Sequence, residues 1–167
     1  MATELYDLTV PVFTRALKAL SGLLDTAVAH AGEAGAEALL ANRLAPDMHP
    51  LSKQVQIACD GPKLCVARLS GVEAPVNEDT ETTIPQLKAR IAATLDWIGS
   101  VPREAIDGQE DREVVLKFPG GEWPFKGQAY VIGFALPNFF FHVTTAYGLL
   151  RQAGVPLGKR DFLGAAG

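Results

Sequence analysis

The segment from Gln128 to Ala153 constrains the fold more than any other, because it predicts a long helix that is apolar on more than one side. Gly154 and Pro156 follow it as stop signals, and Pro137 is expected to kink it. The apolar side chains that exceed a single stripe are Phe134, Leu136, Phe139, Phe140, Phe141 and Val143. A helix apolar nearly all round is either central in a bundle or meets a second subunit.

Three further amphipathic stretches predict helices over residues 11–30, 50–69 and 84–98. The first is expected to begin at Pro11, which suits a first turn. Glycines at positions 32 and 35 are expected to end it, and a short helix over Ala36–Leu44 follows.

The second of these stretches is expected to be capped by Asp47 and to bend without breaking at Gly61-Pro62. The third opens with a capping box of Thr83 and Gln86, and Gly99 is expected to end it.

Two β-prone runs, 113–118 and 123–126, flank a Pro-Gly-Gly turn and predict a hairpin. Pro124 restricts the second strand to a sheet edge. The tail over 155–167 shows no periodicity. We therefore predict an all-α four-helix bundle with a small β-hairpin between the third and fourth helices, and one domain spanning residues 1–167.

Charge and composition exclude several classes of protein. A net charge of -4 and the lack of a basic stripe argue against a nucleic-acid partner. The sequence contains no run of about 18 apolar residues, so no membrane span is predicted. The start of the chain lacks the pattern of a signal peptide. Cys59 and Cys65 form no CxxC motif, so they are expected to be unpaired and buried, which favours a cytoplasmic location.

His142 is the leading candidate for chemistry, and Asn138 lies four residues earlier, so both are expected on one helix face. Such a pair on a bundle helix can orient a ligand or hold a metal. The simpler interpretation is a buried histidine that is hydrogen-bonded to Asn138 or to a neighbouring helix. His30 is sufficiently explained by its place near the end of a helix, where a cation is favourable. His49 lies just ahead of the helix over 50–69, and its meeting His142 at one metal is retained as an alternative.

The helix over 50–69 carries Gln54, Gln56 and Asp60, the last two separated by one helical turn. A group among these that faced His142 would set its tautomer or complete an acid–base pair. The alternative is a solvated face for the glutamines and a structural role for Asp60 beside the bend. No phosphate loop, nucleophile elbow or di-iron motif is present in the sequence.

The run FALPNFFFHVTTAY at residues 134–147 resembles the signature of the DUF1993 family. Five more segments resemble the same family in order along the chain: 10–13, 43–48, 54–58, 78–83 and 154–164. This family is similar to the DinB/YfiT-like superfamily, so the resemblance implies an up-down-down-up helical bundle, often dimeric, with a site between helices. It also implies metal binding by three histidines in many members, and thiol transfer in some.

The resemblance places His142 at the second histidine of a His-x-x-x-His pair, with Asn138 in place of the first. Gln54 or Gln56 stands nearest to the position of the remaining histidine. We therefore predict a homodimer joined through the helix over 128–153, with a degenerate metal site at His142 and a small-molecule-binding or structural role. The alternative is a metal-dependent hydrolase or thiol transferase that uses His142. No cofactor is predicted on the first hypothesis, and a divalent metal is expected on the second.

Overall fold

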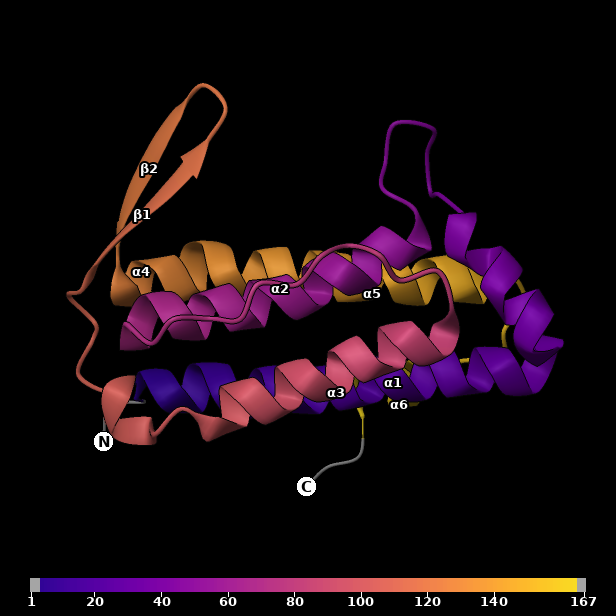
Figure 1. Cartoon of the computed structure of the whole chain (residues 1–167), viewed down its shortest axis with the longest axis horizontal. Coiled ribbons are helices and arrows are strands. Elements are labelled where there is room, and N and C mark those ends of the chain that lie inside the picture. Colours follow the sequence, from indigo (N-terminus) through magenta and orange to yellow (C-terminus); the bar gives the residue numbers. More distant parts are fainter. Residues whose placement is uncertain (1–3, 165–167) are drawn as a thin grey trace.

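The computed structural model describes residues 4–164, in which long helical segments run side by side (Figure 1). These are α1 (Leu5–Ala38), α2 (Leu51–Ser70), α3 (Ile84–Ser100) and a continuous stretch formed by α4 (Gly127–Tyr130), the π-helical turn η3 (Val131–Ala135) and α5 (Leu136–Gln152). The shorter elements are η1 (Leu39–Ala41), η2 (Arg103–Ala105), β1 (Glu113–Phe118), β2 (Gly121–Lys126) and α6 (Lys159–Leu163). A mostly helical fold with a small antiparallel hairpin is therefore confirmed.

Residues 71–83 form an extended connection that runs the length of the molecule between α2 and α3 (Figure 1). Gly71 ends α2 in the left-handed conformation, with φ of 77°. Because the connection returns to the other end, α2 and α3 point the same way while α1 and α5 point the opposite way. The most extensive helix–helix packing joins α2 to α5.

The core between these helices is apolar and closely packed. Phe13 of α1 and Phe139 of α5 are fully buried and meet edge to face, with ring centroids 4.9 Å apart. Cys59 and Cys65 are buried and free, as the sequence predicts. Burial raises the pKa of each thiol to about 12, so both stay protonated and serve as packing groups.

Helix α1 is longer than expected at both ends. It begins at Leu5, so the prediction of a start at Pro11 is wrong, and the missing N–H of Pro11 removes one hydrogen bond within the helix. Burial of Leu5 and Val10 around that turn offsets the loss. Gly32 breaks the helix with φ of 71°, as expected, but helical structure resumes at once and reaches Ala38.

The starts of α2 and α3 test the capping predictions. Pro50 occupies the cap position of α2, so the prediction of Asp47 as its cap is wrong, whereas α2 continues through Pro62 as expected. The capping box of Thr83 and Gln86 is present at α3. Gly99 lies inside α3 and does not end it, because the helix continues to Ser100.

The predicted kink in the last long helix takes the form of a π turn. This turn, η3, directly precedes Pro137, which has no N–H to donate to the preceding helical turn, so the widened turn accommodates the proline within a continuous helical stretch. The tail is less irregular than expected, because Asp161 accepts a hydrogen bond from the Gly158 N–H and initiates α6. Residues 165–167 of the predicted tail and the first three residues of the predicted domain lie outside the described part.

The hairpin pairs β1 with β2 and projects from one end of the helices (Figure 1). Pro124 lies opposite Val115 in this register, on a strand with a free edge. Val114 and Leu116 point inward and are buried, whereas the Trp123 side chain of β2 is 53% exposed.

One stretch of the described chain, Gly127–Gln152, is long and apolar enough to cross a membrane by length and composition alone. The core helix of a soluble domain has the same properties, and this stretch packs against α2. The structure is therefore compatible with a soluble domain.

Candidate functional site

The five residues predicted to form one site lie in three environments, two of which share Asp60. Gln54 meets His142, Gln56 and Asp60 join a charged network, and Asn138 lines a cavity whose wall also includes Asp60. The antiparallel packing of α2 on α5 explains the separation, because Gln54 lies opposite His142 while Gly61 lies opposite Asn138. Asn138 and His142, which are one turn apart on α5, therefore face different residues of α2.

The His142 environment is a buried hydrogen-bonded chain. Gln54 Nε2 donates to the carbonyl oxygen of His49 at 3.1 Å, which turns Gln54 Oε1 toward His142 Nδ1 at 2.7 Å. Because an amide oxygen only accepts, Nδ1 carries the proton and Nε2 keeps its lone pair. The simpler interpretation of His142 is thus supported, with Gln54 as the partner in place of Asn138.

Burial, together with the smaller effect of the nearby charge of His49, lowers the pKa of His142 to about 4. The imidazole is therefore neutral at pH 7 and is 8% exposed. Among residues 4–164, no group of three or more His, Cys, Asp or Glu side chains converges on a point that could hold a metal ion. Gln54 Oε1 is occupied by Nδ1, and Asn138 faces elsewhere, so the residues around His142 do not fit a divalent cation.

Gln56 and Asp60 face the connection over 71–83 and α3, where the buried side chain of Arg90 is the centre of a charged network. Arg90 Nη2 donates to both oxygens of Asp60 at 2.9 Å. Its Nη1 lies 3.1 Å from Glu81 and 3.0 Å from Asp79. Burial alone would lower the pKa of Arg90, but Asp60 and Glu81 outweigh it and raise that pKa.

This network is balanced in charge. Lys63 lies 3.1 Å from Asp60, and Lys53 pairs with Asp79. Three cations thus face three carboxylates, and Gln56 donates to Glu81 at 3.0 Å. The arrangement ties the long connection to α2 and α3, which is a structural role for both predicted residues.

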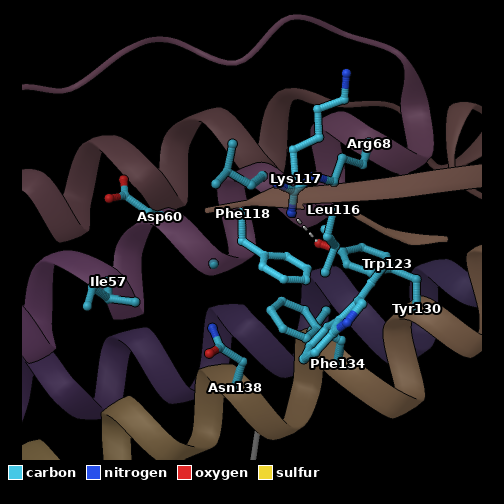
Figure 2. Close-up of a pocket in the computed structure, with 13 residues that line it drawn as sticks. Ile57, Asp60, Arg68, Leu116, Lys117, Phe118, Trp123, Tyr130, Phe134 and Asn138 are labelled. Carbon is cyan, nitrogen blue, oxygen red and sulfur yellow. Dashed lines mark hydrogen bonds between the residues drawn. The ribbon is translucent and has the colours of Figure 1, made fainter. Parts of the chain in front are cut away.

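Asn138 lines a cavity of about 340 Å³ beneath the hairpin (Figure 2). This volume lies within the range of small-molecule sites. Its remaining walls come from α2, β1, β2 and the α4–α5 stretch, and are formed by Ile57, Asp60, Gly61, Leu64, Arg68, Leu116, Lys117, Phe118, Trp123, Tyr130, Phe134 and Ala135.

Glycine and the π turn shape this cavity. A Cβ at Gly61 would approach Asn138 Nδ2 no closer than 4.0 Å, so open space remains between α2 and α5 here. The π turn widens the helix just before Asn138, and such turns are frequent at functional sites. The Asn138 amide is half-buried and makes no hydrogen bond within residues 4–164.

Arg68 and Tyr130 form the polar end of the cavity. Arg68 Nη1 donates to the Tyr130 hydroxyl oxygen at 2.8 Å, and the guanidinium carbon lies 5.6 Å from the ring centroid. Burial raises the pKa of Tyr130 to about 12, so the phenol keeps its proton. Phe134 stacks on Tyr130 with ring centroids 6.0 Å apart.

Sequence reasoning missed Arg68, Arg90, Trp123 and Tyr130. The sequence feature that could have indicated the cavity is the presence of aromatic residues in the hairpin, just before the apolar helix that Pro137 interrupts. The register that brings Phe118 and Trp123 toward Phe134 appears only in the folded chain.

Comparison with solved structures places this architecture among DinB-type proteins. The crystal structure of a DinB family member protein from Shewanella denitrificans shares 40% sequence identity with this chain, at a TM-score of 0.86. The match covers 97% of this chain and 93% of that chain. The chain belongs to the family described as a domain of unknown function, DUF1993, whose model matches residues 5–163. A comparison with curated proteins finds no match.

Proposed function

We propose that this chain is a single-domain, DinB-like four-helix bundle that binds a small molecule in the cavity beneath its hairpin. The observation that carries the proposal is the Asn138 amide, half-buried beside the cavity and without a hydrogen-bond partner in the described chain. The amide is accessible from the cavity and not sealed in the core, so a ligand seated there can supply the hydrogen bond that water otherwise makes.

The other predicted site residues support structure around this cavity. Asp60 contributes to its wall but is held by Arg90, while Gln54 and His142 satisfy each other. A hydrolase or thiol transferase that used His142 with a metal has no comparable support, because the surrounding donors do not fit a divalent cation and His142 does not line the cavity.

A cavity-filling pair of variants tests the proposal. The probe is N-phenyl-1-naphthylamine, a neutral fluorophore whose emission rises in apolar surroundings. Gly61→Leu places a side chain in the cavity, and Gly22→Leu makes the same change in α1, where a Cβ meets nothing within 4 Å. Both changes raise helix propensity by a similar amount.

We expect the probe to bind the unmodified protein and Gly22→Leu equally, and to bind Gly61→Leu at least tenfold more weakly. Equal binding to all three proteins would place the probe elsewhere and contradict the proposal. No fluorescence rise with the unmodified protein would also contradict it.

A second proposal concerns the partner of α5. Residues 127–150 contain no Asp, Glu, Lys or Arg, although parts of this stretch are exposed, including Phe141 at 53%. A surface hollow there is lined by Leu44, Phe140, Phe141, Thr144, Thr145 and Gly148. Depletion of charge together with exposed aromatic side chains is typical of interface centres. We propose that a second copy of the chain covers this face and that the protein is a homodimer.

Light scattering coupled to size-exclusion chromatography tests the dimer. We expect twice the mass of the chain for the unmodified protein and a single-chain mass for Phe141→Glu. The control is Val76→Glu on the long connection, where the native valine is 93% exposed and the dimer should persist. A monomer at micromolar concentration, or association with liposomes in its place, would contradict a dimer through α5.

A further inference from the structure

The charges around the cavity beneath the hairpin differ in how completely they are paired. Asp60 is neutralised by Arg90 and Lys63, and Lys117 lies 3.6 Å from Glu122 on the exposed hairpin. Arg68, by contrast, makes no ion pair with any carboxylate in residues 4–164. The wall therefore carries one excess positive charge, on a half-buried guanidinium.

The hydrogen bond between Arg68 and Tyr130 leaves donors free at that end of the cavity. The Tyr130 hydroxyl oxygen accepts from Nη1, so its own proton remains to be donated. The guanidinium has five N–H groups, and only one is used in this bond. A planar fork with a hydroxyl beside it matches the two oxygens of a carboxylate.

The remainder of the cavity favours a flat ring. Figure 2 shows the side chains of Phe118, Trp123 and Phe134 gathered between Arg68 and Asn138. Trp123 meets Phe118 and Phe134 edge to face, at centroid separations of 4.9 Å and 6.5 Å. Aromatic walls of this kind hold a planar ligand by offset or edge contacts.

We infer that the cavity binds an aromatic carboxylic acid, with its carboxylate at Arg68 and Tyr130 and its ring among Phe118, Trp123 and Phe134. This inference rests on the proposed binding function and names the chemical class of its ligand. At the opposite end, the Asn138 amide is available to a polar substituent of the ring.

Three probes of one shape test the inference by titration calorimetry: 2-naphthoate, 2-naphthamide and 2-naphthylmethylammonium. We expect 2-naphthoate to bind the full-length protein at least tenfold more tightly than the amide, and the ammonium to bind least. Gly61→Leu should weaken the acid and the amide alike, because it fills the cavity that both occupy.

Variants then separate the charge of Arg68 from its structural bond. Arg68→Met should reduce the preference for acid over amide to less than twofold, because the acid loses its charged partner whereas the amide loses only a neutral hydrogen bond. Tyr130→Phe removes the same internal hydrogen bond but keeps the guanidinium, so a preference for the acid should remain. Arg151→Met is the control, because it removes an exposed arginine of α5 that does not line the cavity, and it should change the preference less than twofold.

The outcomes distinguish this inference from the proposed function. Equal binding of acid and amide, both lost in Gly61→Leu, would overturn the aromatic-acid inference and leave the binding cavity standing. Preference for the ammonium would overturn it as well and identify Asp60 as the dominant charge. No binding of any probe, together with no binding of the neutral fluorophore, would overturn both.

Discussion

The two sides of α2 treat polar groups in opposite ways. On the side facing the connection over 71–83 and α3, Asp60 meets a full set of partners around Arg90. On the side facing the hairpin and α5, Arg68 of α2 and Asn138 of α5 retain unused donors beside a cavity. Both sides lie on one continuous helix, so the difference comes from what packs against it.

The comparison distinguishes polar side chains that are paired within the protein from polar side chains that are free to bind a ligand. A buried charge whose partners all come from the protein is held in one arrangement, and removal of one member leaves the others unpaired. A polar group at a cavity wall without such partners contributes little to folding and remains free to meet a ligand. Variants on the two sides are therefore expected to differ more in stability than in their effect on binding.

The largest effect is expected from Arg90→Met. It leaves Asp60, Glu81 and Asp79 without their shared buried cation, and should lower the free energy of unfolding by about 3–5 kcal/mol. Urea denaturation followed by circular dichroism measures this loss. Arg103→Met is the matched control, since Arg103 also bridges two carboxylates but does so at the surface. Its loss should be much smaller, and equal losses would contradict the distinction.

A second effect is the dependence of stability on pH that arises from the buried pair of Gln54 and His142. The pKa of His142 is about 4 in the folded protein, below its ordinary value of 6.5. Above pH 6.5 the imidazole is neutral in both states, and its contribution to stability is complete. As the pH falls from 6.5 to 4, the unfolded chain takes up a proton that the folded chain excludes. Stability therefore decreases, by at most about 3 kcal/mol from this group.

NMR titration of the imidazole checks the folded pKa of His142 directly. Replacement of His49 by Gln should raise that pKa, because it removes a neighbouring positive charge. In the double variant Gln54→Leu/His142→Leu, this part of the pH dependence of unfolding should be absent. A folded pKa near 6.5 would show that the ring is hydrated and would contradict the buried arrangement.

The smallest expected effects compare two amides. Gln54→Leu leaves the buried Nδ1–H of His142 without an acceptor and should destabilise the protein by about 1–3 kcal/mol. Asn138→Leu removes an amide that has no hydrogen bond within residues 4–164, and should change stability by less than about 0.5 kcal/mol. Thermal unfolding of both variants measures the difference. A larger loss for Asn138→Leu would mean that its amide supports the fold.

Local patterns predicted the helices and the cap of α3, but not the cap of α2. The capping box of Thr83 and Gln86 is set by residues three apart in the chain, so sequence alone suffices for it. Helix ends at Pro11 and Gly99 were misplaced because buried apolar neighbours outweigh the local preference of one residue. The π turn has no simple sequence signature and was expected only as a kink.

The site was less predictable, since its composition depends on which turns of two helices meet. Asn138 and His142 share a helix face in principle, but α2 presents Gly61 to one and Gln54 to the other. Arg90 lies beside the apolar stripe of α3 in an unremarkable position. Its role depends on carboxylates that a long connection brings back from a distant part of the chain.

The extended connection over 71–83 has a consequence for how the chain emerges from the ribosome. By sending the chain back along the molecule, it pairs α2 chiefly with α5, whose facing residues are synthesised much later, as for Gln54 and His142, which are 88 positions apart. At about 5–20 residues per second, the apolar stripe of α2 waits several seconds for its main partner. During that interval Leu51 and Val55, fully buried at the end, are open to nascent-chain chaperones. Slowing translation between Ser70 and Leu136 should therefore lengthen chaperone association without any change in the final fold.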